Sequence, residues 1–492
     1  MARLKGAKRQ KNQLELAFGG GMKSEARSPS FEGTEVSMAK RSAESLAPDE
    51  QWMEKVCQRE NLWQAFKRVK RNGGGPGVDG MTVDDFADYL KQHWITIREQ
   101  LLSGTYQPQP VRRVEIPKPD GGVRKLGIPT VLDRLIQQAV MQVLQGSWDH
   151  TFSESSYGFR PGRSAHQAVA RAQQHIAAGH RWVVDLDLEK FFDRVNHDKL
   201  MSQVARRIKD KRLLQLIRSW LKAGVMENGL VGTTEEGTPQ GGPLSPLLSN
   251  LVLDQLDREL ERRGHRFVRY ADDCNIYVRS RRAGQRLMGG LTGLLEGKLK
   301  LKVNREKSAV ARPWERKFLG FSFTNGTAPK RRIAPKAVIR FQARIRVLTR
   351  RTRGISLEKM VREVGRYLQG WQGYFGFCQT PTVLDRFNKW IRRRIRSAAC
   401  KQWRSGKTRY ARLRQLGLSH DLAARTAGHQ WGPWRLSRTQ ALSYAMPSTF
   451  FESLGLPHTR RLILPNRRVR TRTHGGVTGK ASDRLPMSIP RP

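Results

Sequence analysis

The stretch RFVRYADDCNIYVRS, from Arg266 to Ser280, places two carboxylates side by side between two short runs that alternate apolar and polar residues. Alternation on both sides of a short polar break predicts a β-hairpin. An Asp at a hairpin tip is ordinary turn chemistry, but a turn needs only one, and the side chains of Asp272 and Asp273 repel each other. Either the pair marks a plain hairpin tip, or a strongly positive group lies between the two side chains.

A third carboxylate lies upstream, at the end of a short apolar run. Asp187 closes the stretch WVVDLD, and RWVVDLDLEKFFDRV as a whole predicts a strand that passes into a helix. Asp187 alone is compatible with a helix N-cap. Together with Asp272 it would instead form a site for a hard divalent cation, because Mg²⁺ prefers oxygen ligands, usually one or two carboxylates plus substrate phosphates.

The charge of the chain indicates a polyanionic partner. The 492 residues include 91 Lys and Arg against 43 Asp and Glu, a net charge of +48. From residue 330 to residue 492 there are 37 basic and 6 acidic residues, so this third of the chain carries +31. Nucleic acid is the partner that offsets such a surplus best. An anionic membrane surface is the competing partner, but we find no basic amphipathic anchor and no long apolar run.

The rest of the sequence suggests a folded protein of two or three domains with polar ends. Residues 1–48 lack apolar periodicity and are expected to be flexible and basic. The cysteines are widely spaced, without a zinc-ligand pattern, so we expect reduced, buried thiols; they are Cys57, Cys274, Cys378 and Cys400.

Helical spacing dominates after residue 330. Apolar residues recur three or four positions apart in two stripes, which predicts two amphipathic helices; these are Val361, Val364, Leu368, Trp371 and Phe375, then Leu384, Phe387, Ile391, Ile395 and Ala398. Four arginines lie between positions of the second stripe, and we expect them to bind RNA phosphates rather than form a merely solvated face; they are Arg392, Arg393, Arg394 and Arg396.

Several motifs, in a fixed order, resemble those of a known family. YADD (Tyr270 to Asp273) resembles the catalytic box of reverse transcriptases, and DLEKFFD (Asp187 to Asp193) resembles their first metal-binding motif. Between them lies TPQGGPLSPLLSN (238–250), and SYGFRPGRSAHQA (156–168), LKVNREKS (301–308) and KFLGFSF (317–323) complete the series. GRYLQGWQGYFGF and FNKWIRRRIR resemble a maturase thumb. The chain thus resembles the reverse transcriptases of bacterial group II introns.

The resemblance implies a fold and a set of site residues. The fold is α+β: a right-hand polymerase with fingers and an antiparallel palm over residues 49–325, an all-α basic thumb or maturase domain over 326–450, and a basic tail over 451–492 that would contact DNA. Two Mg²⁺ ions would bind Asp187 and Asp272, with Asp273 in support. The implied nucleotide-binding residues are Lys118 and Arg124 for the triphosphate, Phe192 as a steric gate against ribose, Gln240, and Lys307.

The implied function has two parts. As a polymerase, the chain would copy RNA into DNA from dNTPs, on a DNA primer or target, in target-primed reverse transcription. As a maturase, it would bind its parent intron RNA and assist splicing. We expect a bacterial cytoplasmic protein associated with nucleic acid and not with a membrane, and, since no His-Asn-His site follows residue 450, one without the endonuclease domain that many family members carry.

Three alternatives remain open. An RNA-binding splicing cofactor without polymerase activity is disfavoured by the intact Asp187, Asp272 and Gln240. Another bacterial retroelement enzyme, such as a retron or diversity-generating reverse transcriptase, is disfavoured by the long thumb. An RNA-dependent RNA polymerase is disfavoured by Phe192 and the YADD box.

Overall fold

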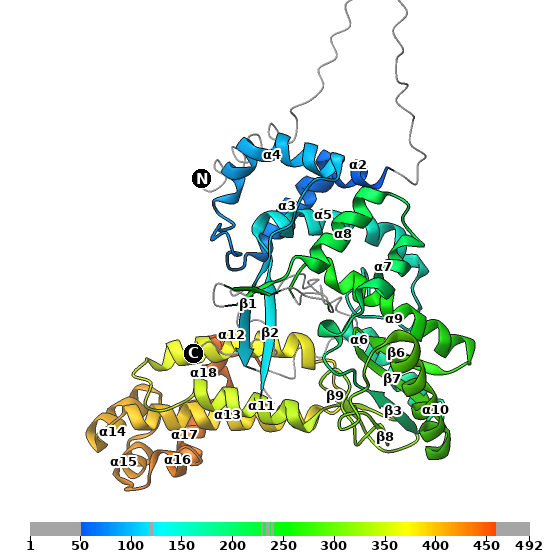
Figure 1. Ribbon diagram of the computed structural model, residues 1–492. Helices are drawn as coiled ribbons and strands as arrows, with labels where there is room; N and C mark the ends of the chain where they lie inside the picture. Colours follow the sequence, from blue (N-terminus) through cyan, green and yellow to red (C-terminus); the bar gives the residue numbers. More distant parts are fainter. Residues whose placement is uncertain (1–50, 118–121, 228–229, 233–236, 238–240, 459–492) are drawn as a thin grey trace, which may run out of the picture.

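The computed structural model describes residues 51–117, 122–227, 230–232, 237 and 241–458 of the chain. Its elements form three groups: an N-terminal group of helices with a long hairpin, a four-stranded sheet with its covering helices, and a C-terminal group made almost entirely of helices (Figure 1). This is the α+β architecture that the sequence predicts.

The N-terminal group corresponds to the expected fingers. Its helices are α2 (Trp52–Val56), α3 (Arg59–Asn72), α4 (Phe86–Ser103) and α5 (Val131–Trp148). Strands β1 (Val111–Pro117) and β2 (Val123–Ile128) pair antiparallel and extend from these helices toward the C-terminal group (Figure 1). The short strands β4 (Val225–Glu227) and β5 (Leu230–Gly232) continue the same sheet beside β1.

The palm is an antiparallel sheet in the order β6-β7-β3-β8. Its strands are β3 (Trp182–Leu186), β6 (Arg266–Tyr270), β7 (Asp273–Val278) and β8 (Ala309–Ala311). The hairpin predicted from the opening stretch is therefore β6 and β7. The helices around it are α6 (Ala165–Ala177), α7 (His197–Ala205), α8 (Lys211–Lys222), α9 (Ser245–Arg262) and α10 (Arg281–Gly293), with η2 (Asp149–Thr151) and the π-helix η4 (Leu294–Leu299).

One local prediction is wrong. The chain does not pass from β3 directly into a helix, because Lys190 adopts a left-handed backbone conformation with φ of 49°. A single 3₁₀ turn, η3 (Phe191–Asp193), follows, and α7 begins only at His197, where the Asn196 side chain accepts a hydrogen bond from the Lys199 backbone N–H.

The palm sheet contributes to two separate hydrophobic cores, because successive side chains of a strand point to opposite faces. Val184, Leu186 and Ile276 belong to a core shared with the fingers and with α9 and α10. Val183 and Tyr277 face the other way and join a core shared with α6 and the C-terminal helices.

The C-terminal group begins with a two-stranded pair, β9 (Phe321–Phe323) and β10 (Arg331–Ile333). Its helices are α11 (Pro335–Leu348), α12 (Leu357–Phe375), α13 (Pro381–Gln402), α14 (Gly406–Gln415), α15 (His420–Gly428), α16 (Pro433–Leu436), α17 (Gln440–Ala445) and α18 (Ser448–Ser453). Both predicted apolar stripes are buried, on α12 and on α13. Phe451 and Leu456 belong to the same core, so the helical packing continues past residue 450.

Two further expectations concern the state of the cysteines and the presence of membrane-spanning helices. All four cysteines are buried and unpaired. Among the described residues, no helix has the length and apolar character required to cross a bilayer.

Candidate active site

Strand register brings the predicted carboxylates together. In the antiparallel pair of β3 and β7, Leu186 lies opposite Cys274. One step further along this register sets Asp187 opposite Asp273, and directly opposed residues in such a pair have Cα atoms about 4.5–5.5 Å apart. Asp272 precedes β7, so all three side chains gather at one end of the palm sheet.

The turn that carries Asp272 is tight and strained. Tyr270 pairs with Asp273, which leaves Ala271 and Asp272 as a two-residue loop. Ala271 has a φ of 56°, as the first loop residue of a type II′ turn requires, and this conformation is costly for any residue except glycine. Gly158 packs so closely on the turn that a Cβ atom there would lie 2.3 Å from the Ala271 nitrogen.

The carboxylates affect one another electrostatically. Burial, followed by the charge of Asp187, raises the pKa of Asp272, while the Arg124 guanidinium on β2 acts in the opposite direction. Asp273 reaches solvent but is closely surrounded by protein; this desolvation, together with the charges of Asp272, Asp185 and Asp187, raises its pKa to about 7. A cation among these groups would relieve the repulsion, which answers the question raised by the adjacent Asp pair.

A loop before β8 fixes the backbone of Asp187. The Asp187 N–H donates to the Ser308 hydroxyl at 3.0 Å, and the Asn304 N–H donates to the Asp187 carbonyl at 2.9 Å. Lys307, a predicted nucleotide contact, is exposed in this same loop, next to Ser308, which binds the Asp187 backbone.

Beneath the Asp272 turn lies a buried arginine that sequence reasoning missed. Arg269 is 0% exposed and forms an ion pair with the equally buried Asp257, at 2.5 Å. Its remaining N–H groups donate to the Ala271 carbonyl at 3.0 Å, to the Asn250 side chain at 2.9 Å and to the Ser156 hydroxyl at 2.8 Å. Burial alone would lower the pKa of Arg269, but the Asp257 carboxylate outweighs it and raises the pKa, so the guanidinium stays charged.

This arginine accounts for the shape of the turn. All five guanidinium donors are used, and one of them holds the carbonyl of the strained Ala271. Asn250 also donates to the Gly158 carbonyl at 2.9 Å, so the network joins α9, the loop before α6 and the catalytic turn. We therefore assign Arg269 a positioning role for Asp272.

A second missed residue is Asp185, two positions before Asp187 on β3. Its carboxylate pairs with Arg316 at 2.6 Å, and the Arg316 guanidinium also donates to the Lys307 carbonyl. Alternation along β3 was the available signal, because residues 185 and 187 share one face of the strand.

The predicted nucleotide-binding residues are spread over several elements. Arg124 is exposed near the end of the finger hairpin, opposite Ile116, yet its charge reaches Asp272. Phe192 is partly buried in η3, with its ring 5.2 Å from that of the fully packed Phe191. Lys118 and Gln240 lie outside the described residues, so their roles stay predictions.

The glycines that follow Gln240 do approach the fingers closely. A Cβ on Gly241, whose φ is 133°, would lie 2.3 Å from the Gly127 carbonyl oxygen, and one on Gly242 would lie 2.4 Å from the Gln137 side-chain oxygen. Gly241 meets backbone at a positive φ, where only glycine fits, whereas at Gly242 the Gln137 side chain would have to move.

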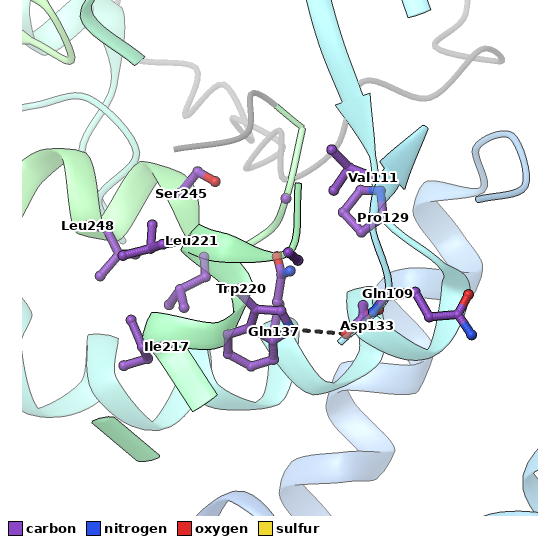
Figure 2. A pocket seen from close by; sticks show the side chains of 13 residues that line it. Gln109, Val111, Pro129, Asp133, Gln137, Ile217, Trp220, Leu221, Ser245 and Leu248 are labelled. Atoms are coloured by element: carbon purple, nitrogen blue, oxygen red, sulfur yellow. Dashed lines mark hydrogen bonds between the residues drawn. The ribbon is translucent and has the colours of Figure 1, made fainter. Parts of the chain in front are cut away.

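A narrow pocket behind these glycines is lined by Asp133 and Trp220 (Figure 2). Asp133 is 1% exposed and accepts hydrogen bonds from the Trp220 indole N–H at 2.9 Å and the Thr130 hydroxyl at 2.8 Å, and from the Tyr106 hydroxyl at 3.1 Å. These protein donors satisfy the carboxylate, so it links the base of the hairpin to α8 instead of binding a ligand.

Comparison with known protein families identifies two domains in the chain. The model described as "Reverse transcriptase (RNA-dependent DNA polymerase)" matches residues 116–323, and "Group II intron, maturase-specific domain" matches residues 338–417. Protein YkfC of Escherichia coli (strain K12) is 36% identical over 295 residues, which are 52% of this chain and 77% of that protein. The chain belongs to the group II intron reverse transcriptases. It carries an RNA-directed DNA polymerase domain followed by a maturase domain, as its sequence predicts.

Other similarities cover a smaller share of the chain. The group II intron-encoded protein LtrA of Lactococcus lactis subsp. cremoris is 42% identical over 196 residues, 39% of this chain but only 32% of that protein. Among solved structures, a chain of a partial Cas6-RT-Cas1--Cas2 complex is 26% identical, with a TM-score of 0.33, over 50% of this chain and 42% of that chain. The maturase-domain match favours the group II assignment over the other retroelement enzymes.

Group II intron reverse transcriptases use divalent metal ions, and the carboxylates fit this need in part. Within the described part of the chain, no three His, Cys, Asp or Glu side chains are grouped to hold a metal by themselves. Asp187 and Asp272 supply two carboxylates, which is the number that Mg²⁺ takes from proteins when substrate phosphates provide the rest. The donor set therefore suits a metal that binds together with a nucleotide.

The four arginines predicted to bind RNA are half-buried on α13 and contact other helices. Arg392 donates to the Ser448 hydroxyl at 3.0 Å, Arg394 to the Thr349 hydroxyl at 2.6 Å, and Arg396 to the Met446 carbonyl at 2.7 Å. Burial lowers the pKa of Arg396 to about 10. These contacts give Arg392, Arg394 and Arg396 a structural role, and RNA binding by all four arginines stays a prediction.

Proposed function

We propose that this reverse transcriptase copies RNA into DNA from a 3′-OH primer, using dNTPs, and that it also binds its parent group II intron RNA to assist splicing and mobility. The observation that carries the proposal is the convergence of Asp187, Asp272 and Asp273 at one end of an antiparallel sheet, within a chain of this family. We expect these activities in the bacterial cytoplasm.

The residues around the carboxylates suit nucleotide transfer. Asp187 and Asp272 would hold two Mg²⁺ ions with Asp273 in support, and such a pair stabilises the attacking and leaving oxygens in phosphoryl transfer. Arg124, on the finger hairpin and electrostatically coupled to Asp272, would face the triphosphate, where positive charge lowers the barrier. Phe192, next to a packed Phe191, would exclude a ribose 2′-OH.

The helical C-terminal group would carry the maturase role. Its surplus of Lys and Arg favours a large polyanion, and binding the folded intron more tightly than its unfolded forms shifts the RNA toward the splicing-competent fold. The RNA would supply the splicing chemistry itself.

A primer-extension assay tests the polymerase part. Purified protein is given an RNA template, a DNA primer, dNTPs and Mg²⁺, beside Asp272→Asn and the control Asp198→Asn, whose carboxylate is 79% exposed and pairs with Arg218 on the surface. We expect extension by the wild type and the control, and none by Asp272→Asn. If no protein extends while intron RNA is still bound tightly, the chain is a splicing cofactor instead.

The maturase part has its own test. Sequencing RNA that copurifies with the protein should return one group II intron as the dominant species. Recovery of bulk RNA without enrichment of an intron would contradict the maturase role.

A further inference from the structure

Two tryptophans are exposed on the helical group at the end of the molecule far from the palm strands. Trp431 is 36% exposed and Trp434 is 40% exposed, and both lie between the end of α15 and the end of α16. Figure 1 shows α14 to α17 at the extremity of this group, opposite β3, β7 and β8. Neighbouring large rings with this much exposed area mark an interaction surface more often than a plain solvated face.

The segment that carries Trp431 is held in place. The His429 ring stacks on the Trp431 ring, with centroids 4.1 Å apart and an interplanar angle of 7°. Arg409, on α14, donates to the carbonyls of Ala427 at 3.0 Å and His429 at 3.1 Å. The His429–Trp431 pair is therefore a pre-ordered stack, and a flat ligand that extends it costs the protein little conformational entropy.

Each tryptophan is paired with an arginine. Arg435 lies over the Trp431 ring at 4.3 Å, and Arg393, on α13, lies over the Trp434 ring at 4.0 Å. Neither arginine forms an ion pair with a carboxylate among the residues that the structure describes. Arg393 also donates one N–H to the Trp434 carbonyl at 3.4 Å, and the other N–H groups of a guanidinium that rests on a ring can face phosphate oxygens.

The charge around the rings excludes most other partners. From residue 401 to residue 446 there are nine Lys and Arg and a single acidic residue, Asp421. Aromatic rings interleaved with positive charge match a ligand that has flat bases and a phosphate backbone. Duplex nucleic acid fits poorly, because its bases are already stacked on each other.

We propose that Trp431 and Trp434 form a stacking platform for unpaired bases of RNA, with Arg393 and Arg435 at the phosphates. Folded RNA displays such bases in loops and bulges, where proteins stack them on aromatic rings and guanidinium planes. The choice of RNA rests on the proposed maturase function. The platform is a second RNA site, apart from the proposed polymerase site at the ends of β3 and β7.

The test measures binding of fluorescein-labelled oligoadenylate RNA of about 12 nucleotides to the full chain. Saturation with unlabelled template–primer beforehand occupies the polymerase cleft. We expect Trp431→Ala and Trp434→Ala each to weaken binding by about 5- to 100-fold, which is the usual range for one stacked base. Trp434→Phe should keep most of the affinity, while Trp434→Leu, which is apolar without an aromatic face, should lose it as the Ala variant does.

Two controls locate the effect. Tyr444→Ala removes another exposed ring, 64% exposed on α17, and should bind RNA like the wild type. Photocrosslinking with 5-iodouridine RNA should label the peptide that carries Trp431 and Trp434. If an Ala variant melts at a lower temperature than the wild type, the comparison of Trp434→Phe with Trp434→Leu decides the result.

Several outcomes would overturn the platform. Equal affinities for the wild type and both Trp variants would do so, as would an equal loss of binding to duplex RNA, which would indicate charge alone. A matching loss with a DNA oligonucleotide would make single-stranded DNA the occupant, and a Trp-dependent capture of anionic vesicles would make it a membrane. The proposed function fails separately, when the wild type neither extends a primer nor binds intron RNA.

Discussion

Replacing the buried Arg269 with Met should both destabilise the palm and impair catalysis. The substitution leaves Asp257, which has no exposed surface, as an uncompensated buried carboxylate. Removing one partner of such a pair costs about 3–5 kcal/mol of unfolding free energy. For one cooperative unit of about 400 residues, with about 2.1 cal/mol/K of unfolding entropy per residue, the melting temperature should fall by about 4–6 °C, as differential scanning calorimetry would show.

A double variant separates stability from positioning. In Arg269→Met/Asp257→Leu both charges are gone, and apolar replacement of a buried ion pair is often neutral. The melting temperature should return close to that of the wild type. Primer extension should not, because the Ala271 carbonyl has lost its donor, and a shift of the Asp272 turn by about 1 Å costs about 100-fold in rate.

The control is Arg218→Met, which breaks a 2.8 Å ion pair with Asp198 at the surface, where the two side chains are 44% and 79% exposed. It should change stability by less than about 1 kcal/mol and leave extension intact. The reasoning is refuted if Arg269→Met melts like Arg218→Met, or if the double variant extends primers at the wild-type rate.

Other predictions concern protons, substrate choice and backbone fit. The pKa of Asp273 is about 7 in the fold but about 4 in an unfolded chain, so the folded state binds more protons between these pH values. The free energy of unfolding in metal-free buffer should therefore fall as pH rises from about 4 to about 7. Asp273→Asn should flatten that slope in thermal melts, and a steeper slope would contradict the raised pKa. Phe192→Val should raise incorporation of ribonucleotides relative to dNTPs by about 10- to 100-fold in single-nucleotide extension, and unchanged discrimination would remove the gate. Gly241→Ala should lower primer extension at least about 10-fold, because its Cβ would collide with the Gly127 carbonyl. The control Gly289→Ala lies in α10, where no atom is close to the added Cβ, so it should leave extension unchanged and stabilise the helix by up to about 1 kcal/mol. Similar activities for the two variants would show that the collision is harmless.

The candidate carboxylates could be placed at strand ends from the sequence because their signals are local. Alternation on both sides of Asp272 defines a hairpin, and the apolar run before Asp187 defines a strand, so each Asp falls at a strand end without any knowledge of the fold. Their meeting follows from the register of β3 and β7, which the sequence alone does not contain.

The support for these carboxylates could not be predicted, because it depends on contacts between distant segments. Arg269 shares a face of β6 with the core residue Phe267, and its charge gives no sign that α9 and the loop before α6 enclose it with hydrogen-bond partners. The arginines of α13 show the same limit. Their long side chains lie along neighbouring helices and donate to them, where a helical pattern shows only a basic face.

The shared cores of the palm sheet limit how the enzyme can be dissected. Val183 and Tyr277 lie on the face that α6 and the C-terminal helices cover, so the second core of the polymerase half is completed only by those helices. A fragment that stopped at residue 323, where the polymerase match ends, would expose an apolar underside and should aggregate. Polymerase and maturase are in this sense one folding unit, and a cut between them should destabilise both halves.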